Sequence, residues 1–195
     1  MLLNDKLKDY HIILASGSPR RQQFFKDLGL QFEIKVKPIK EEYPSRLRHF
    51  EISDYLAQLK ALPFKSELNA NDLLITSDTI VWHNNKALGK PTSETEAFFM
   101  LSALSGSTHE VITSVCFTRK AYQKTVNSIS KVTFKELSRE EIEHYIKTYK
   151  PFDKAGAYGI QEWIGLIGIT RIEGSYFNVV GLPTDLVYST LNNLD

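Results

Sequence analysis

The stretch "LLITSDTIVW", residues 73–82, decides the fold and raises the main chemical question of this chain. Its residues are mostly apolar, β-branched or aromatic, which predicts a buried central strand. The strand runs on into "HNNKALGKP", where Asn84 and Asn85 supply the tight turn of a hairpin. Asp78 stands in the middle of the run, where strand propensity and desolvation both disfavour a carboxylate that has no partner.

Two explanations of Asp78 fit the sequence. A metal ion, or a water molecule that must be deprotonated, would account for a carboxylate at this position. Alternatively, Asp78 lies at a strand end and accepts hydrogen bonds from backbone N–H groups. The residues alone leave both explanations open.

Helical and strand patterns alternate on both sides of this central strand. Further strands are predicted at residues 11–15, 31–39, 109–120 and 124–137, and helices at residues 19–28, 51–60, 93–104, after the cap Ser138, and at about 184–191. The strands at 109–120 and 124–137 are expected to pair antiparallel. Interleaved helices and strands without an obvious linker predict one mixed α/β domain.

The stretch "ASGSPRR", residues 15–21, places two arginines where a helix begins. Ser18 suits the N-cap and Pro19 the first helical position, so Arg20 and Arg21 fall in the first turn. The helix dipole disfavours each cation there by about 0.3–1 kcal/mol. A bound anion such as polyphosphate reverses that sign, because backbone N–H groups and guanidinium groups then converge on the same oxygens. The alternative is a plain helix cap with both arginines in solvent.

The composition is that of an ordinary globular protein, and it narrows the choice of partners. Of 195 residues, 42% are hydrophobic and 24% are charged, and the formal net charge is +1. A near-neutral chain lacks the many basic contacts of nonspecific nucleic-acid binding, so any anion site must be local. Cys116 is the only cysteine, and no window has the apolar length of a membrane span. We therefore expect a cytoplasmic protein that binds neither nucleic acid nor membranes.

Six segments together carry a resemblance to a known family. They are "LASGSPRR", "LKA", "SDTIV", "LGKP", "DKAGAYGIQ" and "GSYFNVVGLP", which occur in this order between Ile12 and Pro183. The chain resembles the Maf family of nucleoside triphosphate pyrophosphatases, whereas it has no Walker-type phosphate loop, no GxGxxG, no GxSxG and no zinc-protease helix. The resemblance implies an elongated mixed sheet flanked by helices, with two lobes around a deep cleft as in inosine triphosphate pyrophosphatases. It also implies a single Maf-like domain over residues 1–195.

The resemblance further implies a cytoplasmic, metal-dependent hydrolase that converts a nucleoside triphosphate to the monophosphate and pyrophosphate. Asp78 matches the catalytic proton acceptor, and Glu41 and Asp78 match the positions that hold Mg²⁺ or Mn²⁺. The matched substrate-binding positions are Ser16, Arg20, Arg21, Lys60 and Lys90. A homodimer is plausible for the family.

The segment "AGAYGIQ" resembles the subgroup that acts on dTTP and UTP. There the positions that set substrate preference match Arg20, Thr79 and Gln161. Glu162 and Trp163 follow Gln161 where the subgroup usually has glycine, so they bear on the choice of base. Two alternatives stay open at this point, a 7-methyl-GTP pyrophosphatase and a noncatalytic nucleotide-binding regulator of cell division.

Overall fold

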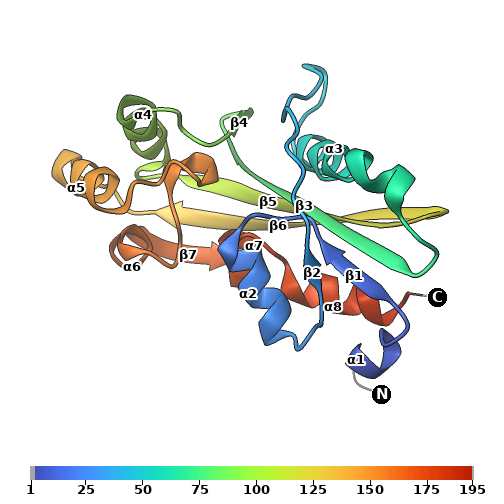
Figure 1. Cartoon of the computed structure of the whole chain (residues 1–195). Helices are drawn as coiled ribbons and strands as arrows, with labels where there is room; N and C mark the ends of the chain where they lie inside the picture. Colours follow the sequence, from blue (N-terminus) through green and yellow to red (C-terminus); the bar gives the residue numbers. More distant parts are fainter. Residues whose placement is uncertain (1–2, 195) are drawn as a thin grey trace. The chain divides into compact units, whose positions relative to one another are not determined.

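The computed structural model describes residues 3–194 and contains a seven-stranded sheet flanked by helices (Figure 1). The strand order is β2-β1-β3-β5-β6-β7, and β4 pairs with β3 outside this path. The strands are β1 (His11–Leu14), β2 (Glu33–Ile34), β3 (Asp72–His83), β4 (Lys86–Leu88), β5 (Thr108–Arg119), β6 (Tyr122–Phe134) and β7 (Ile169–Glu173). The mixed α/β class predicted from the sequence is therefore confirmed.

Eight α-helices and two short 3₁₀ helices are assigned in the described part of the chain. The α-helices are α1 (Leu3–Lys6), α2 (Pro19–Asp27), α3 (Phe50–Ala61), α4 (Glu94–Leu104), α5 (Arg139–Tyr149), α6 (Trp163–Gly168), α7 (Tyr176–Val180) and α8 (Thr184–Asn192), and the 3₁₀ helices are η1 (Leu62–Glu67) and η2 (Ala155–Ala157). Among residues 3–194, no helix has the length and apolar character needed to cross a membrane.

The chain divides into two compact units. Unit 1 contains the chain up to Asp78, residues 113–128 and the chain from Gly181 onward, and unit 2 contains residues 79–112 and 129–180. Strands β3, β5 and β6 each contribute residues to both units. The two lobes that the resemblance implies correspond to this division. The deep cleft and the single domain over residues 1–195 stay predictions, and residues 1–2 and 195 lie outside the described part.

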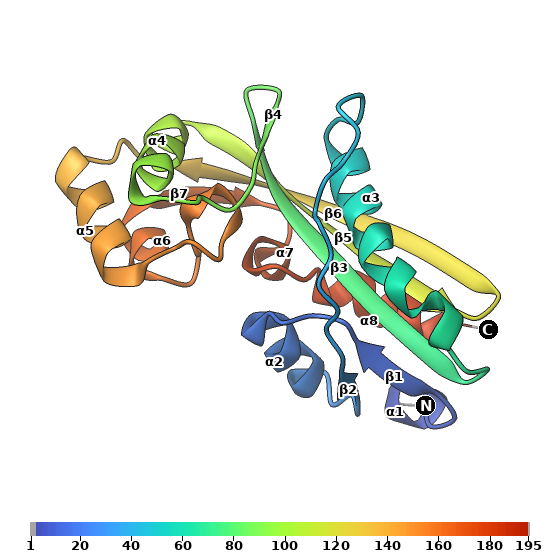
Figure 2. The same cartoon turned by 45° about the horizontal axis from the view of Figure 1, so that its top comes forward.

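In unit 1, helices cover both faces of a parallel core. Strand β1 pairs in parallel with β2 and β3, and Leu14 lies opposite Ile75 in the register. One face packs against α2 and α8 through Ile12, Leu14, Phe25, Leu73, Ile75, Val187 and Leu191. The other face packs near α3 and η1 through Ile13, Ala61, Phe64, Leu68 and Leu74. Figure 2 shows α3 running along β3 in this unit, as expected for a parallel sheet that is buried on both faces.

The alternation of side chains along β3 determines the direction of Asp78. Leu74 packs on the α3 side, and the Thr76 hydroxyl on the same side donates a hydrogen bond of 2.6 Å to the Ala57 carbonyl of α3. Residues two apart on a strand share a face, so Asp78 faces α3 as well.

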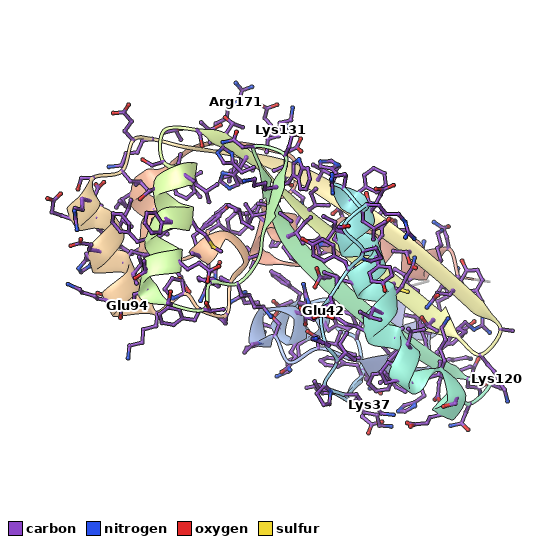
Figure 3. The ribbon with its side chains drawn as sticks, turned by 90° about the horizontal axis from the view of Figure 1, so that it is seen from above. Lys37, Glu42, Glu94, Lys120, Lys131 and Arg171 are labelled. Atoms are coloured by element: carbon purple, nitrogen blue, oxygen red, sulfur yellow. The ribbon has the colours of Figure 1, made fainter. Side chains whose placement is uncertain are left out.

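The turn and the helix caps that short sequence motifs predict are confirmed in unit 2. Asn84 and Asn85 have φ values of 49° and 60° and join β3 to the antiparallel strand β4. Ser93 caps α4 by accepting from the Glu96 N–H, and Ser138 caps α5 in a reciprocal capping box. The strands β5 and β6, which contribute residues to both units, form the expected hairpin, and Lys120 at its tip belongs to unit 1 (Figure 3).

The strand predicted over residues 31–39 is wrong beyond Glu33–Ile34. Strand β2 lies at the edge of the sheet, and Ile34 and Val36 remain 45% and 60% exposed. Ile34 and Val36 therefore lack an apolar layer to pack against, and the pairing of β2 with β1 stops after two residues.

Asp72 anchors the start of β3 and makes the fold sensitive to acid. Its carboxylate lies 2.8 Å from Nδ1 of His11 and accepts hydrogen bonds of 2.7 and 3.1 Å from the backbone and side-chain amides of Asn69. Burial alone would raise the pKa of Asp72, but these hydrogen bonds outweigh burial and hold the pKa below its ordinary value.

We predict that Asp72→Asn lowers the free energy of unfolding by about 2 kcal/mol at pH 7. A carboxyl group with a lowered folded-state pKa stabilises the fold above the unfolded pKa of about 3.9 and loses that contribution as the pH falls through the folded value. Urea unfolding between pH 7 and about 2 should therefore show a steeper acid loss for the wild type than for Asp72→Asn, with the difference arising below about pH 4. Asp27→Asn, on the exposed end of α2, is the control, and equal pH slopes for wild type and Asp72→Asn would contradict the prediction.

Candidate functional site

Helix α2 begins where the sequence predicts, with its N-terminus free of a side-chain cap. Ser18 occupies the N-cap position, but its side chain makes no capping hydrogen bond. The Ser16 hydroxyl instead accepts a 3.2 Å hydrogen bond from the Ser18 N–H, and the Ser16 carbonyl accepts one of 3.0 Å from the Gln22 side chain. Gly17, between Ser16 and Ser18, has open space beside its Cα, since a Cβ there would meet no atom within 4 Å. The loop is thus held by its own hydrogen bonds, and the Ser18 side chain does not cap the first turn of α2.

Arg21 does not point into solvent. Its Nε donates a 2.8 Å hydrogen bond to the Gly181 carbonyl, and a terminal nitrogen donates one of 2.9 Å to the Ser77 carbonyl. Burial lowers the pKa of Arg21, and the nearby carboxylate of Asp78 opposes that effect. Because an arginine stays protonated in proteins, its charge lies next to the peptide that precedes Asp78. The plain helix cap with two solvated arginines is therefore wrong for Arg21, while Arg20 beside it is half-buried.

Asp78 shares the ammonium group of Lys60 with a second carboxylate. Nζ of Lys60 lies 2.6 Å from Oδ1 of Asp78 and 3.1 Å from Oε1 of Glu41. The exposed fraction of the side chain rises from 7% at Asp78 to 17% at Lys60 and 41% at Glu41. The Glu41 side of this group is therefore the more accessible to solvent. The explanation of Asp78 as a strand end satisfied by backbone N–H groups is not needed, because Lys60 pairs with its charge.

Burial has the largest effect on the ionisation of Asp78. It raises the pKa of Asp78 above its ordinary value, while Lys60 and then Arg21 act in the opposite direction. The result is a carboxylate that binds a proton more readily than an exposed aspartate does, and that lies next to two cations.

Unit 1 therefore brings together most of the predicted site residues. Arg20, Glu41 and Asp78 all act electrostatically on Arg21, and Lys60 joins Asp78 to Glu41. Ser16 lies in the loop that precedes these arginines. Sequence reasoning missed the two carbonyls that hold Arg21, at Ser77 and Gly181. Backbone acceptors carry no signal in the sequence of side chains.

The remaining predicted residues, Thr79, Lys90 and Gln161, belong to unit 2. Thr79 is half-buried, and Lys90 and Gln161 are exposed.

A backbone contact joins the segment of Lys90 to the segment that leads to Gln161. The Gly156 N–H donates a 3.0 Å hydrogen bond to the carbonyl of Gly89, which precedes Lys90. Gly156 has φ +67°, and a Cβ there would come within 2.8 Å of the Val81 side chain. Only glycine suits this combination of left-handed backbone and close approach. "LGKP" and "DKAGAYGIQ", far apart in the sequence, are thus neighbours in unit 2.

The two acidic residues Asp78 and Glu41 are the residues here that fit a metal. Among residues 3–194, no group of three or more His, Cys, Asp and Glu side chains is arranged as a preformed metal site. Carboxylate oxygens are nevertheless the donors that Mg²⁺ and Mn²⁺ prefer, and Mg²⁺ typically binds one or two carboxylates together with substrate phosphates. Both carboxylates already face one cation, the Lys60 ammonium.

Known proteins resemble this chain along nearly its whole length. Residues 11–194 match the family described as Maf-like protein. A dTTP/UTP pyrophosphatase of Flavobacterium johnsoniae is 58% identical, over 99% of this chain and 100% of the relative. One of Flavobacterium psychrophilum is 59% identical, over 98% of each chain.

The fold has a counterpart of low sequence similarity among solved structures. A HAM1 protein from Coxiella burnetii aligns with a TM-score of 0.54 at 14% identity, over 95% of this chain and 100% of that one. The family match and the near full-length identity to its curated relatives show that this chain belongs to the Maf family.

Proposed function

We propose that this chain hydrolyses dTTP and UTP to the nucleoside monophosphate and pyrophosphate. The observation that carries the proposal is the buried Asp78 carboxylate, paired with Lys60 beside Glu41 and Arg21. The name dTTP/UTP pyrophosphatase, which the Flavobacterium relatives bear, supports the choice of reaction and substrates. The proposal includes a cytoplasmic location, a homodimer and one working domain made of both units.

The triphosphate is bound by the start of α2 and by basic side chains. The N–H groups of the first turn, which the Ser18 side chain leaves uncapped, and the Arg20 guanidinium converge on phosphate oxygens. Ser16 and Lys90 add polar contacts. Arg21 has a different role from Arg20, because its hydrogen bonds to the Ser77 and Gly181 carbonyls already fix its position. It supplies a fixed positive charge next to the scissile anhydride.

Asp78 and Glu41 would hold the divalent metal, Mg²⁺ or Mn²⁺. When bound, the metal would neutralise negative charge that develops on the phosphate oxygens. Lys60 holds the two carboxylates close to each other in the absence of the metal, since its ammonium group contacts both. This placement limits the reorganisation that the site needs before substrate binds.

Asp78 accepts the proton of the attacking water. The water oxygen forms a bond to the α-phosphorus, the bond from that phosphorus to the bridging oxygen breaks, and pyrophosphate leaves with the electron pair. A general base works best when its pKa lies nearer the operating pH, and burial raises the pKa of Asp78 in that direction.

Gln161 and Thr79 select the base, together with Arg20. The Gln161 amide has one donor side and one acceptor side, which match the N3–H and a carbonyl of uracil or thymine. Gln161 is exposed at the end of its loop, so the amide is available to a ligand.

We predict that Asp78→Asn lowers kcat for dTTP by about 10²–10⁴-fold, the typical contribution of a general base, and leaves nucleotide binding largely intact. Pyrophosphate release with Mg²⁺ or Mn²⁺ measures turnover, and calorimetry with a nonhydrolysable analogue measures binding. Asp185→Asn, an exposed carboxylate in the first turn of α8, is the matched control.

The same assay, run with a panel of triphosphates, tests the proposed function itself. The wild type should act on dTTP and UTP in preference to the other nucleotides. Preferred turnover of 7-methyl-GTP would contradict the choice of substrate. Tight binding without turnover in either metal would instead identify a noncatalytic nucleotide-binding protein.

The two arginines should respond differently to truncation. Arg20→Ala should raise KM for dTTP by about 10-fold or more, the size of one charge-assisted contact, without changing the melting temperature. Arg21→Ala should also lower the melting temperature, because it leaves the Ser77 and Gly181 carbonyls without their donor. Arg139→Ala, an exposed arginine paired with Glu143, serves as the control. Equal melting temperatures for the Arg20 and Arg21 variants would show that Arg21 does not hold the fold as described.

Replacing Lys60 should show how much the free energy of unfolding depends on its pairing with Asp78. Lys60→Met leaves a buried carboxylate without its main partner and should lower the free energy of unfolding by about 3 kcal/mol. Adding Asp78→Asn to Lys60→Met should recover part of this loss, so urea unfolding of the two single variants and the double variant should be non-additive. Lys37→Met, which removes a cation paired with the exposed Glu67, is the control. Additive effects of the Lys60 and Asp78 changes would refute a direct energetic coupling.

A further inference from the structure

The loop that ends at Gln161 is held by three side chains for which the proposed chemistry has no use. They are Tyr145 on α5, Lys154 at the start of the loop and Glu162 directly after Gln161. All three belong to unit 2. We call them the loop clasp.

Tyr145 connects the clasp to the backbone on the N-terminal side of Gln161. Its side chain is fully buried, its hydroxyl donates a hydrogen bond to Oε2 of Glu162, and it accepts one of 3.0 Å from the Gly159 N–H. Burial, followed by the contact with Glu162, raises the pKa of Tyr145, so the phenol remains a donor at physiological pH.

Lys154 closes the loop from its other end. Its Nζ lies 3.1 Å from Oε1 of Glu162 and 2.7 Å from Oδ1 of Asp153, and the side chain is almost fully buried. Residues 154 and 162 bracket the loop, so this ion pair ties its two ends together. A Cβ on Gly159 would come within 2.9 Å of the Glu162 carboxyl carbon and 3.1 Å of the Lys154 side chain, which shows how closely both cover the loop.

Gly165, three residues after Glu162, restricts the loop further. A Cβ on Gly165 would lie 1.9 Å from the carbonyl oxygen of Ile160, so glycine at 165 lets α6 approach the peptide just before Gln161. Gln161 itself is exposed between these fixed neighbours. The backbone on both sides of Gln161 is therefore held, while its side chain is open to a ligand.

From this geometry we propose that Glu162 is a positioning residue that sets base selectivity by fixing the backbone from which Gln161 reaches the base. The proposal rests on the proposed function. An amide that turns over exchanges its donor and its acceptor, and it then matches the amino group and ring nitrogen of cytosine as well as it matches the imide of uracil or thymine. Selection of the imide therefore requires that Gln161 approach the base from one constant backbone position. The Glu162 carboxylate holds that backbone through its contacts with Tyr145 and Lys154.

The test compares dTTP with dCTP. Glu162→Ala should lower the ratio of kcat/KM for dTTP over dCTP by about tenfold, mainly by raising KM for dTTP, with kcat for dTTP changed less than about twofold. Glu162→Gln keeps an acceptor for Tyr145 but loses the charge that pairs with Lys154, so its ratio should be intermediate. Glu143→Ala removes an exposed carboxylate of α5 and should leave the ratio unchanged.

Selectivity separates positioning from a purely structural role. Loss of folded protein lowers the active fraction for both nucleotides equally and leaves the ratio as in the wild type. Should Glu162→Ala fail to fold, Tyr145→Phe removes the donor to Glu162 with little change in volume and should lower the same ratio. An unchanged ratio in the folded variants would overturn the inference. Absence of pyrophosphate release from dTTP by the wild type would instead overturn the proposed function, so the two failures are distinguishable.

Discussion

The Asp78 carboxylate, buried on the central strand, is the constraint that the elements around it must satisfy. Strand β3 lies between β1 and β5 and is covered on both faces in unit 1, so an ionised carboxylate there loses its hydration. Helix α3 brings Lys60 to it from one face. Helix α2, which packs on the opposite face, brings the Arg21 charge to the neighbouring Ser77 carbonyl. Cations from two helices on opposite faces of β3 thus act on the same buried carboxylate.

Stability alone does not explain this pair. Replacing a buried ion pair by well-packed apolar residues is often neutral or stabilising, so a fold has little to gain from a Lys–Asp contact on its central strand. The contact instead matters for the proposed chemistry. Burial raises the pKa of Asp78, and the Lys60 ammonium also contacts Glu41, which brings a second carboxylate close. The two carboxylates consequently lie beside one cation, the Lys60 ammonium, and under the proposed function they would need little reorganisation to hold a divalent metal.

Sequence reasoning succeeded where the signal is local. Asn84 and Asn85 form the predicted turn, and Ser93 and Ser138 cap their helices, because each motif contacts residues within a few positions. It failed for residues 31–39, since alternation does not reveal that β2 is an edge strand. It could not show that Arg21 contacts Ser77 and Gly181, which are 56 and 160 positions away. Lys60 carries no distinctive pattern either, and only the family resemblance singled it out.

The division into units separates two tasks. Asp78 is the last residue of β3 in unit 1, and Thr79 is the first in unit 2. The carboxylates and the fixed arginine belong to unit 1, whereas Gln161 and its clasp belong to unit 2. The contacts of Glu162 are with Tyr145 and Lys154, which belong to unit 2 as well. If Gln161 selects the base as proposed, changes in the clasp act on that choice, whereas the ion pair of Asp78 with Lys60 lies among residues of unit 1. The proposed selection of the base and the proposed hydrolysis thus draw on different sets of residues.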